Sequence, residues 1–370
     1  MEIDHEGFLY PRVDAETCIG CNLCEKVCPV MNPLDPLTIK ATYGFKNSSE
    51  TIREDSSSGG FFSQISEYVI KNNGIVFGAR FDDSWNVIMD YSDNLSGLKK
   101  FRGSKYVQSR NNEAFKIARQ FLNEKKIVLF SGTPCQIAAF KNYLRHDYDN
   151  LITLDFICHG MPSPGIWKKY LSETKLGNDT MQITDINFRA KQPNGYNWLK
   201  YGVVIKSDVR VVVSDSHKVN PYMKAFLANI TIRPSCSECP AKSGRSQSDI
   251  SMADFWGVKE INHDFFDNKG VSLVFAHTMR GCELIKEIKG DRVVLPNNDV
   301  AITNISYSQS SRLHPKRSVF FALWQQSPLI PLMNKFSKES LVSKIKYQIR
   351  VLLVKMNLNY RLNKIRNHYK

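Results

Sequence analysis

The chain has 370 residues, 42% of them hydrophobic and 11% aromatic, enough for two domains of ordinary size with a sizeable core. Its net charge of +14 is concentrated at the end, because nine of the ten Lys, Arg, Asp and Glu residues from Lys338 onward are basic. The remaining body is mildly basic and carries no zinc-finger, helix-turn-helix or RNA-binding signature, so we expect no nucleic-acid partner. The start of the chain lacks the pattern of a secretory signal, and no apolar run is long enough to cross a membrane, so we expect a cytoplasmic protein.

The chain is expected to begin with a small cysteine-rich module, residues 1–35, which ends among three prolines between Pro29 and Pro36. A polar loop follows, up to residue 60. Helices and strands then alternate, with helices predicted at 61–71, 112–123 and 165–174 and strands predicted at 74–81, 127–130 and 151–157. A turn at 131–134 is expected to lead into a further helix that ends at Arg145. This alternation predicts an α/β body with a largely parallel sheet.

After Met181 the predicted strands come closer together, which indicates a second, mixed-sheet region with more antiparallel pairing. These strands are expected at 183–188, 199–206 and 210–213. We divide the body into an N-terminal part, residues 36–150, and a C-terminal part, residues 151–330, and assign the chain to the α+β or α/β class.

Residues 331–370 are predicted to carry a basic amphipathic helix. One face of this helix is apolar and the other basic between Leu341 and Tyr360. Two interpretations are open: weak contact with an anionic membrane surface, or packing of the helix against the body or another protein chain.

The clearest chemical signal lies near the N-terminus. Cys18, Cys21, Cys24 and Cys28, the last followed by proline, have the spacing of a bacterial 4Fe-4S ferredoxin motif. Zinc sites prefer paired Cys-x-x-Cys units, and the nine cysteines are not expected to form disulfides in a reducing compartment. The first three cysteines are predicted cluster ligands. In two-cluster ferredoxins the cysteine at this position ligates another cluster, but no second cysteine run precedes Cys18 here. Either Cys28 completes the same cluster, as we expect, or the native chain starts upstream of Met1.

Four further cysteines are dispersed along the body. Cys135 follows one predicted strand, Cys158 follows the next, and Cys236 and Cys239 form a Cys-x-x-Cys pair. Because the carboxyl ends of parallel strands share one edge of a sheet, the first two are expected near each other. Three interpretations are open: a second iron–sulfur cluster, a zinc site, or ordinary buried cysteines.

Several short motifs suit an anionic ligand. The turn Ser56–Gly60 leads into a predicted helix, whose N-terminal amides could hold a phosphate, and the loop Arg102–Tyr106 offers two cations around a glycine. A capped helix start and a solvated loop are the alternatives. His159 could donate a proton or merely cap a strand end, and the aromatic stretch 254–257 suits core packing better than a cofactor wall. No Gly-x-Gly-x-x-Gly follows a predicted strand.

Taken together, these motifs resemble the beta subunit family of the coenzyme F420-reducing hydrogenases and dehydrogenases. The resemblance spans about residues 44–257, and the cysteine run in front is similar to the ferredoxin module of many members. The motifs that carry it are Ser56–Gly60, Arg102–Ser109, Gly132–Gln136, Cys158–Pro162, the pair Cys236 and Cys239, and Asp254–Gly257.

The resemblance implies an iron–sulfur flavoprotein in which one or two 4Fe-4S clusters exchange electrons with FAD. It implies eight cluster ligands, namely Cys18, Cys21, Cys24, Cys28, Cys135, Cys158, Cys236 and Cys239. It implies FAD contacts at Ser57, Ser58, Gly59, Gly60, Arg102, Gly103, Ser104, Lys105, Thr133 and Gln136. His159, Lys105 and Tyr106 are the catalytic candidates.

On this basis we expect an oxidoreductase that reduces an unidentified small organic acceptor, in line with family members linked to surface polysaccharide synthesis. Its electrons would come from an electron-donor protein or a redox partner subunit. The alternative is an electron-carrier subunit of a larger redox complex, without substrate chemistry of its own.

Overall fold

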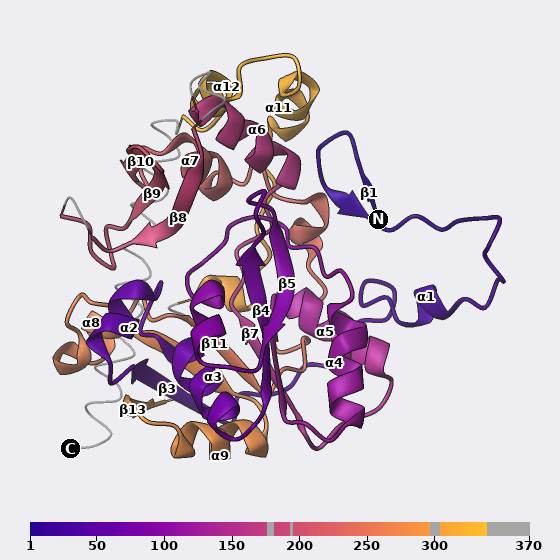
Figure 1. Ribbon diagram of the computed structural model, residues 1–370, viewed down its shortest axis with the longest axis vertical. Helices are drawn as coiled ribbons and strands as arrows, with labels where there is room; N and C mark the ends of the chain where they lie inside the picture. The colour runs from indigo at the N-terminus through magenta and orange to yellow at the C-terminus, as the bar shows by residue number, and fades with distance from the viewer. Residues whose placement is uncertain (176–180, 193–194, 297–303, 339–370) are drawn as a thin grey trace.

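The main sheet has eight strands in the order β13-β3-β12-β11-β7-β6-β4-β5 (Figure 1). The computed structural model describes residues 1–175, 181–192, 195–296 and 304–338, so the helix predicted from Leu341 lies outside the described residues. The strands are β3 (Ala41–Lys46), β4 (Ile75–Phe81), β5 (Val87–Ser92), β6 (Val128–Gly132), β7 (Leu151–Phe156), β11 (Ile250–Asp254), β12 (Ser272–Ala276) and β13 (Asp291–Leu295).

Strands β4, β6, β7 and β11 are neighbours and run parallel, whereas the outer strands pair antiparallel. The predicted parallel sheet is therefore confirmed for the centre of the body. All five residues of β6 are buried, as are the first five of β7, because helices cover both faces of the parallel strands.

The helices of the main body divide between the two faces of the sheet. Phe61 and Ile65 of α3 share a core with Ile285 of α9, while Ala118 of α4 and Phe140 of α5 belong to a separate core. The helical segments are α2 (Glu50–Asp55), α3 (Phe61–Lys71), η1 (Ser96–Phe101), α4 (Ala114–Asn123), α5 (Pro134–Leu144), α8 (Val258–Ile261), η3 (His263–Phe265) and α9 (Met279–Glu287).

A smaller lobe stands above the carboxyl ends of the parallel strands (Figure 1). Its antiparallel sheet, in the order β10-β9-β8, has the pairing expected after Met181. Trp167 and Tyr222 lie in a core that also includes residues of the C-terminal helices. The lobe contains α6 (Pro164–Thr174), β8 (Ile183–Ala190), β9 (Gly202–Ser207), β10 (Val211–Ser216), α7 (Pro221–Leu227), α11 (Arg317–Leu323) and α12 (Leu329–Phe336).

The chain enters this lobe after β7 and returns to the main sheet at β11. A short 3-10 segment, η2 (Pro234–Glu238), precedes β11, and a second, η5 (Ile305–Tyr307), follows β13 and precedes α11. The stretch expected to be a polar loop before residue 60 contains β3 and α2, so that expectation was wrong. Its residues are ordered by pairing of β3 with β12 and β13, which lie more than 200 residues further along the chain.

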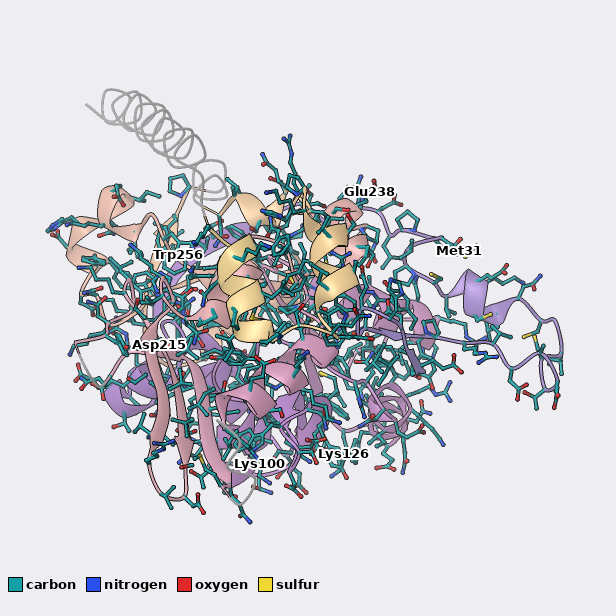
Figure 2. All side chains as sticks on the ribbon, turned by 90° about the horizontal axis from the view of Figure 1, so that it is seen from above. Met31, Lys100, Lys126, Asp215, Glu238 and Trp256 are labelled. Atoms are coloured by element: carbon teal, nitrogen blue, oxygen red, sulfur yellow. The ribbon has the colours of Figure 1, made fainter. Side chains whose placement is uncertain are left out.

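The N-terminal module divides into two parts. Its start, which includes β1 (Glu2–Ile3) and β2 (Leu9–Tyr10), packs on the smaller lobe, where the Phe8 side chain is fully buried with its ring centroid 6.2 Å from that of Phe321. Gly7 adopts φ +81°, and a Cβ there would lie 2.7 Å from the Cα of Gly165, so only glycine fits. Beyond Tyr10 the segment carrying α1 (Leu23–Lys26) extends away from the body, and in the view from above it stands clear with Met31 on its connection (Figures 1 and 2).

A buried ion pair fastens this start to the smaller lobe. The Arg317 guanidinium donates to both carboxylate oxygens of Glu6, at 2.6 and 2.5 Å, and its Nε donates to the Ile232 carbonyl at 3.0 Å. The two side chains are only 9% and 10% exposed. Within the described residues, no helix has the length and apolar character needed to cross a membrane.

We predict that Glu6→Ala lowers the free energy of unfolding by about 3–5 kcal/mol, because it leaves the Arg317 charge buried without its partner. Urea denaturation of the purified protein measures this loss. Glu2→Ala is the matched control, since the Glu2–Arg12 pair is solvent-exposed and its removal should cost less than about 1 kcal/mol. Equal losses of unfolding free energy in the two variants would contradict a stabilising role of the buried Glu6–Arg317 pair.

Candidate functional site

A cavity of about 390 Å³ opens between the main sheet and the smaller lobe. It lies at the carboxyl ends of β4, β6, β7 and β11, where ligands of α/β sheets commonly bind. The predicted motifs meet there: its lining includes Ser57, Ser58, Gly60, Arg102–Tyr106, Thr133, Gln136, Cys158–Pro162, Asp254 and Trp256. Of the predicted flavin-contacting and catalytic residues, Gly59 alone is absent from the lining.

The turn Ser56–Gly60, called the serine turn below, connects α2 to α3 and lies against the outer part of the sheet. Gly59 sits so close to β3 and β12 that a Cβ would lie 2.3 Å from the Phe45 carbonyl oxygen and 2.5 Å from the Ser272 amide nitrogen. The Ser58 hydroxyl donates to the Val271 carbonyl at 2.8 Å. Gly60, at φ +82°, then starts α3, whose first residues line the cavity. The glycines thus bring the N-terminus of an 11-residue helix to the cavity wall.

A buried lysine supports the turn from behind. The Lys191 ammonium donates to the carbonyl oxygens of Arg53, Ser58 and Lys269 at 2.7, 2.8 and 2.7 Å. Burial lowers the pKa of Lys191 to about 7, whereas these three carbonyls favour its charged form. Sequence analysis missed Lys191, because its acceptors are 78 to 138 residues away along the chain.

The loop Arg102–Tyr106 is hydrogen-bonded to the serine turn. The Ser57 hydroxyl oxygen accepts from the Ser104 amide at 2.8 Å and lies 2.9 Å from the Ser104 hydroxyl. Arg102 donates to Ser63, in the first turn of α3, and to Asp55. Gly103 has φ +83°, and no atom of the described residues lies within 4 Å of the position of a Cβ. The two motifs therefore form one continuous wall.

Lys105, a catalytic candidate, is engaged within its own loop. Its ammonium donates to the carbonyl oxygens of Lys100, Phe101, Arg102 and Gly103, at 2.9 to 3.2 Å. Burial lowers its pKa to about 7, while four carbonyl acceptors favour the ammonium. These bonds hold the end of η1 and occupy all three N–H groups of the ammonium, so none is free for a substrate.

Thr133 and Gln136 cap α5 reciprocally. The Thr133 hydroxyl accepts from the Gln136 amide, and the Gln136 side-chain oxygen accepts from the Thr133 amide at 3.0 Å. The Gln136 side-chain nitrogen also donates to Ser109 and Asn111, at 2.8 Å each. This cap directs the N-terminus of a second 11-residue helix toward the cavity.

His159 and Tyr106 stand on the lobe side of the cavity. The His159 ring nitrogen Nε2 is 2.6 Å from the Asn229 side-chain oxygen, and burial lowers the pKa of His159, which favours the neutral ring. Tyr106 packs against Phe226 and Phe188, with its hydroxyl 3.4 Å from Arg189. Their catalytic assignment stays a prediction.

An ion pair that sequence analysis missed joins the smaller lobe to the main sheet at the cavity. Arg189 of β8 donates both terminal nitrogens to Asp254 of β11, at 3.1 Å each. Although burial alone would lower it, Asp254 keeps the pKa of Arg189 above its ordinary value. The buried Trp198 donates to the same carboxylate at 2.7 Å, and its ring stacks on Trp256, whose own ring is 40% exposed.

The four dispersed cysteines come together beside the cavity. Every pair among Cys135, Cys158, Cys236 and Cys239 interacts electrostatically, and all four are free thiols. Burial raises the pKa of Cys135 and Cys158 and raises that of Cys236 to about 11, so these thiols hold their protons without a metal. In the described part of the chain, no three Cys, His, Asp or Glu side chains are grouped closely enough for a single metal ion.

The N-terminal cysteines have a different setting. Cys18, Cys21 and Cys24 are exposed and Cys28 is half-buried. None of the residues of α1 is buried, so this short segment has no core of its own, as is usual for segments that a metal site orders.

Comparisons with known protein families agree with the resemblance. Residues 125–297 match the family described as the C terminus of the coenzyme F420 hydrogenase/dehydrogenase beta subunit, and residues 11–31, which contain the first four cysteines, match the 4Fe-4S binding domain. No curated protein matches the chain. Among solved structures, a chain of the F420-reducing NiFe hydrogenase complex from Methanosarcina barkeri is similar, with 14% identity and a TM-score of 0.48. That match covers 81% of this chain and 91% of the other.

The ion pair between Arg53 and Asp267, which precedes the serine turn in the chain at Arg53, leads to a prediction about the pH dependence of stability. Arg53 pairs with Asp267 through two bonds of 2.7 and 2.5 Å, and Lys46 lies 3.1 Å from the same carboxylate. Although burial raises it, these partners lower the pKa of Asp267 from 3.8 to about 2. A carboxylate with a depressed pKa stabilises the fold above the unfolded value and loses that contribution as pH falls through the folded value.

We therefore expect Asp267→Asn to be less stable than the wild type by about 1 kcal/mol at pH 6, since Asp267 is partly exposed and solvent screens the pair. The gap should close between pH 4 and 2, as measured by denaturant unfolding at each pH. Asp264→Asn, a fully exposed neighbour, is the control and should show no such gap. A gap that persists at pH 2 would argue against the ion pair.

Proposed function

We propose that this chain belongs to the coenzyme F420 hydrogenase/dehydrogenase beta subunit family and is an iron–sulfur flavoprotein oxidoreductase, because residues 125–297 match that family and residues 11–31 match a 4Fe-4S binding domain. In this proposal FAD occupies the cavity and exchanges electrons with a cluster bound by Cys135, Cys158, Cys236 and Cys239. The observation that carries it is that Cys158 both lines the cavity and belongs to the four-cysteine group.

The cavity suits a flavin dinucleotide in two ways. The N-termini of α3 and α5 both reach its lining, and two helix ends at one site favour a diphosphate. Three of the large apolar residues in its lining, Phe156, Leu227 and Trp256, are 38 to 43% exposed, as expected for side chains that a flat ring would cover. Bound FAD would supply the conversion between one-electron and two-electron transfer.

The chain's own residues would then divide the work. The serine turn and the loop from Arg102 to Ser104 hold the phosphates, with Lys191 and Lys105 stiffening the backbone behind them. His159, which is hydrogen-bonded to Asn229 and whose neutral form burial favours, would exchange a proton with the acceptor. The four thiols must release protons when they bind iron.

Electrons would enter through the N-terminal cluster, ligated by Cys18, Cys21, Cys24 and Cys28. The exposure of the segment that carries them suits docking of an electron-donor protein or redox partner subunit. The same exposure supports the second candidate function, an electron carrier within a larger redox complex. The acceptor is an organic molecule small enough for the cavity, and the proposed pathway is surface polysaccharide synthesis.

The full-length protein purified without oxygen tests the flavin. We expect both flavin and iron–sulfur absorption, and release of one FAD per chain on denaturation. When a small organic acceptor is added to the reduced protein, the flavin and iron–sulfur absorption of the oxidised protein should return. Iron–sulfur absorption without released FAD would overturn the reductase and leave the electron carrier.

The body cluster has its own test. We expect Cys236→Ser to lower the iron content by about one cluster's worth, since a missing thiolate opens one corner of the site. Iron and acid-labile sulfide per chain are the measurements. Cys282→Ser is the matched control, because Cys282 is buried in α9, in the core beneath the sheet, and should leave the iron unchanged. Equal iron content in the two variants would contradict the proposal that Cys236 and the other body cysteines bind a second cluster.

A further inference from the structure

Arg233 stands between the root of the N-terminal segment and the four-cysteine group. It immediately precedes η2, where its carbonyl accepts from the Cys236 amide at 3.0 Å. Its own amide donates to the Met161 carbonyl at 2.8 Å, in the stretch that follows Cys158. The backbone of Arg233 is thus hydrogen-bonded both to the stretch that follows Cys158 and to the segment that carries Cys236 and Cys239.

Its side chain makes the connection to the N-terminal segment. The guanidinium lies 3.9 Å from the centroid of the Tyr10 ring, and Tyr10 ends β2, directly before residues 11–31. Its positive charge also acts on Cys135 and Cys236. One cation therefore contacts the base of the ferredoxin-type segment and acts on two thiols of the body site.

The guanidinium has an unused donor. The Nε of Arg233 is fully buried and finds no hydrogen-bond partner among the residues that the structure describes. A second cation near the cysteines, Lys242, has no such shortage, because its ammonium donates to the carbonyl oxygens of Cys158 and Ser306 at 2.5 and 2.6 Å. A buried N–H without an acceptor is costly, and sulfur atoms of a cluster held by the neighbouring thiolates would provide one.

Resting on the proposed four-cysteine cluster, we propose that Arg233 donates to a sulfur of that cluster and raises its reduction potential, with Tyr10 positioning the guanidinium. Hydrogen bonds to sulfur and nearby positive charge both stabilise the reduced cluster, which gains one electron and one negative charge. Arginine stays protonated throughout, so the step moves no proton. The body cluster is thereby made the better acceptor for electrons from the N-terminal cluster.

The test is a potential titration of the anaerobic full-length protein, with the clusters followed by electron paramagnetic resonance. We expect Arg233→Met to lower the potential of the body cluster, raising its oxidised-to-reduced ratio at a fixed poise about tenfold, which is 59 mV for one electron. Arg233→Lys, which keeps the charge, should restore at least half of the shift. Tyr10→Leu should shift the potential in the same direction by a smaller amount.

Arg119→Met is the matched control, because Arg119 also stacks on a tyrosine, 4.9 Å from the Tyr143 ring, but does not act on the cysteines. It should leave the potential unchanged. If Arg233→Met keeps its full iron content and its body-cluster potential is unchanged, the role of Arg233 is overturned and the proposed function stands. Absence of the body cluster from the wild type overturns the proposed function as well. If Arg233→Met loses iron, the potentials of Arg233→Lys and Tyr10→Leu decide instead. A body-cluster potential below that of the wild type in these variants supports the role of Arg233, and an unchanged potential in both overturns it.

Discussion

The parallel pairing of β4, β6, β7 and β11 is the constraint on which the rest of the site depends. Parallel strands end at one edge, and each strand that is followed by a helix also brings the helix N-terminus there. Thr133 at the start of α5 and Cys158 after β7 are neighbours of the cavity for this reason, although they are 25 residues apart. A sheet with antiparallel centre strands would send these groups to opposite edges.

Buried cations hold the cavity walls in place. Lys105 and Lys191 each give their ammonium to backbone carbonyls, and Arg189 crosses from the lobe to the sheet to meet Asp254. An amide carbonyl that is buried without a donor is unfavourable, so these side chains allow tight turns to be buried beside a cavity. The same residues leave few free charges at the wall. Helix N-termini and backbone amides are then the main groups that a bound anion would meet.

The N-terminal segment has two physical characters. Up to Tyr10 it is tied to the smaller lobe by Phe8 and by the Glu6–Arg317 pair, whereas the cysteine-bearing part has little contact with the body. Such a part gains most of its order from the metal it binds. Tyr10 and Arg233 lie at the junction, so their contact links the base of the cysteine-bearing segment to the segment that carries Cys236 and Cys239.

The sequence by itself determined the ferredoxin-type cysteine spacing, the central strands and helices, and the antiparallel lobe after Met181, because these depend on local periodicity and turn residues. Tertiary structure decided what local pattern could not: that β3 is a strand, since its partners come more than 200 residues later, and that four cysteines between Cys135 and Cys239 meet. It also decided the roles of Arg189, Lys191 and Arg233. Each is an ordinary basic residue in the sequence, and its function arises only from distant groups that folding brings within hydrogen-bonding or ring-stacking distance.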